Sequence, residues 1–342
     1  MTTLESLYVT ARDALAVALD GSRSVGFVNF PNHGNPGDPA IWLGTQRLLA
    51  DLGVSVDYSS AWWNFDADNA RRAVGDAPIL LNGGGNFGDL YAGQQGARKT
   101  VLRTMSGNRV IQMPQSIHFK DPARVEEMRG LIDAHGGFTM MTRERRSEAI
   151  ARDEFGMEPI LSPDHALALG AAPPPVEPAS DVVWIGRQPG DPEFLASAAP
   201  PPEAGLASFE WMNGVLADQA TWDEEGLAAL ARNAALVALH TAGQPVPEAE
   251  QRDAASTFEP LARRWVAYGM RTLAAGRFVV TDKLHGHIFC ALMGLPHVVL
   301  DNSYGKVSGT LDAWTGGLPG VHRARDGADA WRLAQELLAA RA

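Results

Sequence analysis

The sequence predicts an α/β protein of two domains. Short β-rich runs alternate along the chain with longer segments of helical pattern, an alternation typical of parallel βαβ units. With 342 residues the chain exceeds the usual size of one hydrophobic core, and either half is long enough to bury a core of its own. A proline-rich stretch near the middle, 171–178, can continue neither a helix nor a central strand, and we place the domain boundary there.

The first half, expected to form a domain over 1–172, contains four clear strand patterns. They span 24–30, 78–82, 109–114 and 137–142. A helix is predicted over 38–52, because Asp38 is a favourable capping residue and Pro39 takes a first helical position, where no backbone N–H is needed. The sequence therefore predicts that the first strand is followed by a loop and then by this helix.

The second half, expected to form a domain over 179–342, repeats the architecture without evident sequence repetition. Strands are predicted over 181–187, 277–281 and 297–301, and helices over 223–240 and 249–274, the latter interrupted near Pro260. We interpret 190–207, rich in Pro, Ala and Gly, as a long surface loop. The last helix is a candidate to pack back on the N-terminal domain.

Composition excludes several function classes. A formal charge of −11 and a pI near 5.3 argue against nucleic acid as a partner, since that binding needs clustered Lys and Arg. The single cysteine, Cys290, allows no internal disulfide and no thiolate metal cluster, which fits a reducing cytoplasm. The N-terminus does not resemble a secretion signal, and the uncharged segment 285–300 is too short to span a bilayer. We expect a cytoplasmic protein without stable membrane insertion.

Two polar, glycine-rich runs are the first candidate ligand loops. Residues 32–38 lie between the first strand and a helix, and residues 82–89 directly follow a strand. Ligands of open parallel sheets bind beyond the carboxyl ends of the strands, and glycines allow close backbone approach. A tight turn explains the glycines alone equally well, but the added Asn and Asp side chains favour a ligand-lined loop. Neither run is a nucleotide phosphate loop, and the GxGxxG spacing within 82–89 is a poor dinucleotide fingerprint because Asp89 would meet the pyrophosphate.

Three cationic side chains follow other predicted strands. Arg143 begins a segment directly after the strand 137–142, where a cation opposes the helix dipole and therefore needs an anionic partner. His285 lies at a helix start after the strand 277–281, and Lys306 lies in the loop after the next strand. If those two strands are neighbours, Lys306 and His285 face one pocket.

Several other residues have structural explanations beside functional ones. His285 and His287 lie two apart on a helix and point to different sides, so we expect no metal site. His287 also fits a buried histidine with satisfied hydrogen bonds, and Cys290 fits a small buried hydrophobic residue. Trp62 and Trp63 suit either stacking on a sugar face or core packing.

Taken together, these segments resemble the polysaccharide pyruvyltransferase family. The pieces that carry the resemblance are 35–41, 83–86, 115–117, 143–144, 163–164, 283–286 and 302–306. Each piece is weak, but they follow one another in order from the first strand to the last third of the chain. One position departs from the family pattern: Lys283 stands where arginine is common, which replaces a planar, bidentate donor by a point charge.

The resemblance implies two Rossmann-like domains facing across a cleft, as in GT-B glycosyltransferases, with the N-terminal domain on the acceptor side and Arg143 at the cleft. It also implies phosphoenolpyruvate as donor substrate, a sugar, oligosaccharide or lipid-linked saccharide as acceptor, and no further cofactor. By that likeness Arg143, His285 and Lys306 are the donor-binding and catalytic residues. We further expect substrate contacts from Asn35, Asp38, Gly84, Gly85, Asn86, Asp89, Gln115, Ser116, Lys283, His287 and Ser303.

Three alternatives remain open at this point. A nucleotide-sugar glycosyltransferase of the same fold would need a nucleoside diphosphate site in the second domain, and no compelling one is visible. A noncatalytic sugar-binding or assembly protein is disfavoured by the Arg, His and Lys trio. A nicotinamide oxidoreductase is the most distant of the three.

Overall fold

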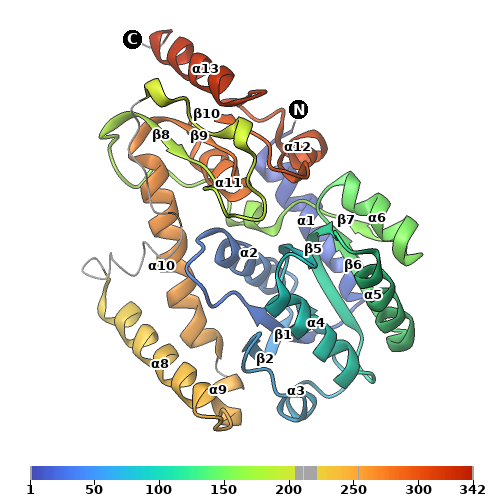
Figure 1. The fold of residues 1–342 in the computed structure, drawn as a ribbon. Coiled ribbons are helices and arrows are strands. Elements are labelled where there is room, and N and C mark those ends of the chain that lie inside the picture. Colours follow the sequence, from blue (N-terminus) through green and yellow to red (C-terminus); the bar gives the residue numbers. More distant parts are fainter. Residues whose placement is uncertain (1, 205–210, 212–221, 253, 341–342) are drawn as a thin grey trace.

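The computed structural model describes residues 2–204, 211, 222–252 and 254–340 and contains two parallel β-sheets (Figure 1). The first sheet has the strand order β2-β1-β3-β5-β6-β7, with β4 paired to β5. The second has the order β11-β10-β9-β8. The predicted α/β class is thus confirmed, and the chain passes from one sheet to the other between residues 161 and 180, across the proline-rich stretch. The exact division into domains stays a prediction.

The strands agree closely with the β-rich runs. The first sheet comprises β1 (Ser24–Phe30), β2 (Ser55–Ala61), β3 (Ile79–Leu81), β4 (Gly84–Gly88), β5 (Val110–His118), β6 (Phe138–Thr142) and β7 (Ile160–Leu161). The second comprises β8 (Ser180–Ile185), β9 (Gly276–Thr281), β10 (His297–Val299) and β11 (Val321–Arg323). The glycine-rich segment 82–89 differs from the prediction of a loop. Its residues Gly84–Gly88 form the strand β4, which pairs with β5 in an irregular register.

Helices cover both sheets. Those of the first half are α1 (Leu4–Leu19), α2 (Gly37–Asp51), α3 (Ala67–Val74), α4 (Ala92–Thr104), α5 (Pro122–His135), α6 (Arg145–Phe155) and the 3₁₀ helix η1 (His165–Leu169). Those of the second half are α8 (Glu224–Thr241), α9 (Glu248–Arg252), α10 (Ala254–Ala274), α11 (Leu284–Met293), α12 (Lys306–Thr310), the π-helical turn η5 (Leu311–Thr315) and α13 (Gly327–Ala339). The described part of the predicted loop 190–207 contains only short 3₁₀ turns, at Ala196–Ala198 and Pro202–Ala204. No helix in the described ranges has the length and apolar character needed to cross a bilayer.

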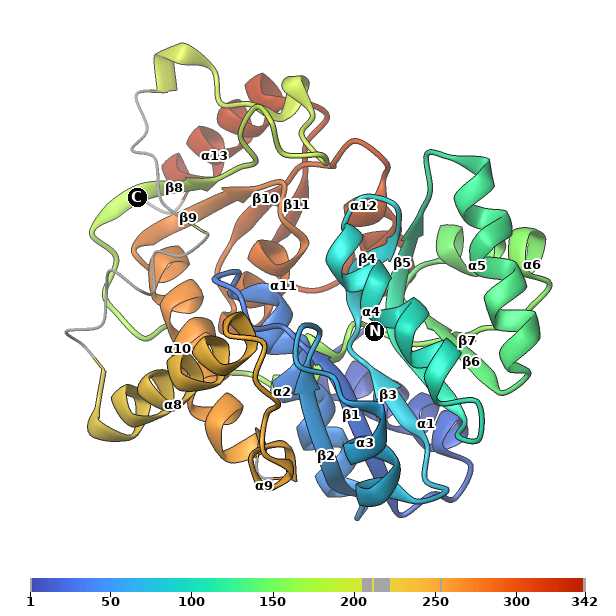
Figure 2. The same cartoon turned by 60° about the horizontal axis from the view of Figure 1, so that its bottom comes forward.

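A shared core joins the two halves. Helix α10 belongs to the second half of the chain but lies against α2 of the first half, as Figures 1 and 2 both show. Phe30 of β1 stacks on Phe258 of α10 with ring centroids 3.9 Å apart. One buried apolar cluster contains residues of β1 and α2 from the first half and of β9 and α10 from the second half. This packing fixes the carboxyl edges of the two sheets relative to each other.

Two expectations about the second half were wrong. The helix does not break near Pro260, which lies inside α10, because packing against α2, α8 and α11 outweighs the hydrogen bond that a proline removes. The last helix, α13, packs on β9 and β10 rather than back on the first sheet. Its Ala330 and Ala334 are fully buried there with Phe278 and Val298, which explains its placement.

Candidate functional site

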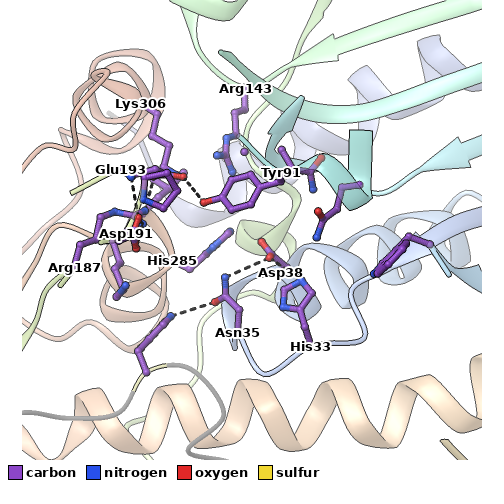
Figure 3. A pocket seen from close by; sticks show the side chains of 18 residues that line it. His33, Asn35, Asp38, Tyr91, Arg143, Arg187, Asp191, Glu193, His285 and Lys306 are labelled. Carbon is purple, nitrogen blue, oxygen red and sulfur yellow. Dashed lines mark hydrogen bonds and ion pairs between the residues drawn. The ribbon is translucent and has the colours of Figure 1, made fainter. Parts of the chain in front are cut away.

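A pocket of about 420 Å³ lies between the two halves (Figure 3). Its walls come from loops and helix starts that follow the strands of both sheets, as expected for parallel sheets. The first half contributes His33, Asn35, Asp38, Trp62, Gly85, Asn86, Tyr91, Gln94 and Arg143. The second contributes Arg187, Asp191, Pro192, Glu193, Trp211, Lys283, Leu284, His285 and Lys306.

Arg143 enters this pocket from the end of β6. Its side chain is only 1% exposed, and its Nη1 donates to Asp164 Oδ2 at 2.7 Å while its Nε donates to Ser116 Oγ at 2.8 Å. These two partners hold the guanidinium plane in place. The remaining nitrogen, Nη2, lies near Gly85, where an added Cβ would be only 3.0 Å away. Glycine at position 85 therefore keeps open the space in front of the guanidinium.

His285 lies in the first turn of α11, and Lys283 is the residue that precedes the helix. The imidazole packs on the backbone of Gly37 so closely that a Cβ there would lie 2.1 Å from Nδ1, so a side chain at Gly37 would displace the ring. The other nitrogen, Nε2, is buried and has no hydrogen-bond partner among the described residues. A polar atom left in this state inside a pocket is available to a ligand.

Asp164 links Arg143 to His285. Its Oδ2 is 3.6 Å from His285 Nε2, too far for a hydrogen bond but close enough for strong charge interaction. Burial alone would raise the pKa of this carboxyl, but His285 and Arg143 outweigh burial and hold the pKa of Asp164 well below its usual range. Asp164 therefore remains ionised and faces His285 as a buried carboxylate.

Lys306 begins α12 and reaches the same pocket. Its Nζ forms an ion pair with Glu193 and would lie 3.3 Å from a Cβ on Gly85. Arg143 and Lys306, which come from different sheets, thus approach one point of the backbone. Burial lowers the pKa of the Lys306 ammonium to about 8, with Glu193 opposing the shift. As predicted, Lys306 and His285 line the same pocket, because the strands that precede them, β10 and β9, are paired.

The structure adds a charged cluster that the sequence had not indicated. Arg187 follows β8 and pairs with Asp191 at 2.9 Å and with Glu193 at 2.6 Å. Glu193 also accepts a hydrogen bond from Tyr91 at 3.0 Å. Although burial favours its neutral form, Lys306 and Arg187 lower the pKa of Glu193 to about 2. The strand-end rule that pointed to Arg143 also applies to Arg187, whereas nothing in the predicted loop singled out Glu193.

Some predicted substrate contacts lie one layer behind the pocket. Ser116 is buried and bonds Arg143 and Glu144, and Gln115 is buried and bonds Asn86. Gly84 has φ +129°, a conformation that favours glycine, and lies beside Asp38. These residues shape the site without lining it, whereas Asn35, Asp38, Gly85, Asn86 and Lys283 do line it.

Three predicted substrate contacts lie elsewhere. Asp89 accepts the backbone N–H groups of Lys120 and Asp121 at 2.8 and 2.9 Å, which ties down the loop after β5. His287 is fully buried and forms hydrogen bonds with His297 and Thr315. It is therefore a core histidine with satisfied hydrogen bonds, the structural explanation considered for it above. Ser303 is exposed and lies outside the pocket lining. Cys290 is also buried, and burial raises the pKa of its thiol.

The described residues include no group of three or more His, Cys, Asp or Glu side chains able to hold a metal ion. The pocket lining includes four cationic side chains, Arg143, Arg187, Lys283 and Lys306, together with His285 and three carboxylates, Asp38, Asp191 and Glu193. The fold and this pocket define the class of the protein. It is an α/β protein whose pocket, between two parallel sheets, suits a small, multiply charged anion.

Comparison with known proteins defines the family. The model of the polysaccharide pyruvyl transferase family matches residues 35–223 and 266–304, and the chain belongs to this family. It is 29% identical over 330 residues to Pyruvyl transferase 1 of Schizosaccharomyces pombe, an alignment that covers 90% of this chain and 74% of that protein. It is also 30% identical over 297 residues to EpsO of Bacillus subtilis, whose name describes a pyruvyl transferase, covering 86% of each chain.

A solved structure supports the fold. A Klebsiella pneumoniae protein of uncharacterized function superposes with a TM-score of 0.60 at 17% identity, covering 95% of this chain and all of the other. At this identity the likeness concerns the fold alone. The homology to pyruvyl transferases implies a transferase activity related to polysaccharides.

Proposed function

We propose that the protein transfers pyruvyl from phosphoenolpyruvate to a pair of hydroxyls on one sugar of a polysaccharide or its precursor, forming a cyclic ketal and releasing phosphate. The observation that carries this proposal is the convergence of Arg143, His285 and Lys306, from two sheets, on one pocket. Phosphoenolpyruvate bears a carboxylate and a phosphate at opposite ends of a three-carbon unit, which suits separated cations. The cleft between the two sheets then corresponds to that of a GT-B-like enzyme.

In this proposal Arg143 and Lys306 hold the carboxylate and the phosphate. His285, which lies 3.6 Å from Asp164, donates a proton to the methylene carbon, and the electron pair of the C=C bond forms the new C–H bond. The middle carbon becomes oxocarbenium-like and is attacked by one sugar hydroxyl. The C–O bond to phosphate then breaks, and the second hydroxyl of the same sugar closes the ring, a step strongly assisted by proximity.

The direct test is a panel of donors and acceptors read by mass spectrometry. Phosphoenolpyruvate and several nucleotide sugars are each incubated with methyl glycosides that offer adjacent or 4,6-related hydroxyls. We expect addition of a pyruvyl ketal, with phosphate release that depends on the sugar. Transfer of a glycosyl unit instead, or binding of nucleotide sugars in preference to phosphoenolpyruvate by calorimetry, would identify a glycosyltransferase.

The charge state of Lys306 predicts how donor binding depends on pH. The lowered pKa of about 8 means that the ammonium form is present below that pH and is lost as the pH rises through it. Calorimetry from about pH 7 to about pH 9.5 should therefore show donor affinity falling by up to about tenfold per unit above the pKa. In Lys306→Met the affinity should be lower at pH 7 and nearly constant over this range. An identical pH profile in both proteins would show that Lys306 does not contact the donor.

A further inference from the structure

The pocket has two walls of different chemistry. The lining Lys and Arg side chains come from the second half of the chain and from the end of β6. The opposite wall, formed by the loops after β1 and β2 and by the start of α2, has no Lys or Arg among its described lining residues and carries His33, Asn35, Asp38 and Trp62. Figure 3 shows Asn35, Asp38 and His33 on one side of His285, and Arg187, Asp191 and Glu193 on the other. At about 420 Å³ the pocket has the size of sites that enclose drug-sized ligands, so it has room for more than a three-carbon donor.

Three carboxylates line the pocket, and two of them are neutralised. Asp191 pairs with Arg187, and Glu193 pairs with both Arg187 and Lys306. A carboxylate held by two cations is a weak base.

The third carboxylate, Asp38, is contacted by Asn35 and His33. It accepts a hydrogen bond from Asn35 Nδ2 at 3.3 Å, and His33 Nε2 lies 3.3 Å from the same oxygen. Within the described ranges no Lys or Arg forms an ion pair with it. Its side chain is 22% exposed, so a ligand can reach it. Asp38 is also fixed in place, since it lies in the first turn of α2 directly after Gly37, which packs on His285.

Trp62 supplies an apolar surface on the same wall. It directly follows β2, is 41% exposed, and lines the pocket. Its ring lies beside Gly93, where an added Cβ would be 3.7 Å from the indole, so the backbone of α4 flanks the ring. Its neighbour Trp63, in contrast, is packed against the core and lies beside His240. A partly exposed aromatic ring in a pocket wall offers a platform for the C–H face of a sugar ring.

We propose that this wall is the acceptor subsite: the saccharide stacks on Trp62, and Asp38 is the general base that takes the proton of the attacking hydroxyl. This rests on the proposed function and adds to it the residues that receive the sugar. His33, whose Nε2 lies beside the Asp38 carboxylate, is a positioning residue.

The protons then balance over one turnover. His285 gives its proton to the methylene carbon, and the first hydroxyl loses its proton to Asp38 as its oxygen bonds to the middle carbon. Breaking of the C–O bond leaves its electron pair on phosphate, which takes the proton from Asp38. The second hydroxyl closes the ketal and returns a proton to His285. The acid thus comes from the second half of the chain and the base from the first half.

The test compares Asp38→Asn with Asp51→Asn, which removes the same charge from the other end of α2, where Asp51 contacts Tyr8. We measure the dissociation constant of phosphoenolpyruvate by calorimetry and the initial rate of phosphate release with the best methyl glycoside of the panel. Asp38→Asn should lower kcat by about 100- to 10,000-fold, the usual range for loss of a general base. Its donor dissociation constant should stay near that of the unmodified protein, and Asp51→Asn should match the unmodified protein in both measurements.

A second variant tests the platform. Trp62→Ala should raise the KM for the methyl glycoside by about fivefold, the usual size of an aromatic contact, with donor binding unchanged, and Trp62→Phe should recover most of the difference. The possible failures are distinguishable. An unmodified protein that releases no phosphate with any glycoside would overturn the proposed function and the subsite with it. Normal turnover in Asp38→Asn, or a loss of donor binding equal to its loss of turnover, would overturn the base assignment alone.

Discussion

Turnover by His285→Ala is expected to fall about 100- to 10,000-fold, the contribution that a positioned general acid typically makes. The proposed proton donor is the buried Nε2, which has no hydrogen-bond partner in the described structure and lies 3.6 Å from the ionised Asp164. The dissociation constant of phosphoenolpyruvate should change far less, because Arg143, Lys306 and Arg187 remain. Steady-state rates of phosphate release and calorimetric donor binding together separate the two effects.

The matched variants for this experiment are His285→Asn and His322→Ala. Asparagine keeps a polar side chain against Gly37 but cannot act as an acid at neutral pH, so it should be as inactive as alanine. His322 lies on β11 of the second sheet and does not line the pocket. Its loss should therefore leave turnover unchanged. Near-normal turnover in His285→Asn would remove His285 from the catalytic step.

The second large effect is expected from Arg143→Met, which acts on both stability and donor binding. It leaves the fully buried Asp164 without its closest cation, and breaking such a pair from one side costs about 3–5 kcal/mol of unfolding free energy. Urea unfolding at pH 7 should show this as a lower midpoint with an unchanged slope. Donor affinity should fall as well, because the guanidinium that faces Gly85 is gone.

The double variant Arg143→Met with Asp164→Asn separates these two roles. Asparagine removes the unpaired charge and can still accept the backbone N–H of Ala166, which Asp164 accepts at 2.9 Å. Most of the lost stability should therefore return, while donor binding should remain weak. If the double variant bound phosphoenolpyruvate as tightly as the unmodified protein, Arg143 would be a purely structural residue.

Sequence patterns located most strands and several pocket residues because both depend on local rules. The β-rich runs and the capping pattern before α2 reappear with shifts of a few residues at their ends. Arg143, His285 and Lys306 were found because each follows a strand, and the carboxyl ends of parallel strands share one edge of a sheet. The same rule placed Asp89 and Ser303 in the site, where the structure does not have them, since being near an edge does not settle which way a side chain points.

The sequence by itself determined the α/β class, the order of the strand-end loops and the chemical groups those loops carry. Only the tertiary structure decided which groups meet. Contact of α12 with α6 brings Arg143 within reach of the segment that carries Lys306, and it is burial that lowers the pKa of Lys306 to about 8. The ion pairs of Glu193 with Arg187 and Lys306 likewise join segments that only the folded chain brings into one pocket. Local propensity acts over a few residues, whereas charge pairing and desolvation depend on distances in space.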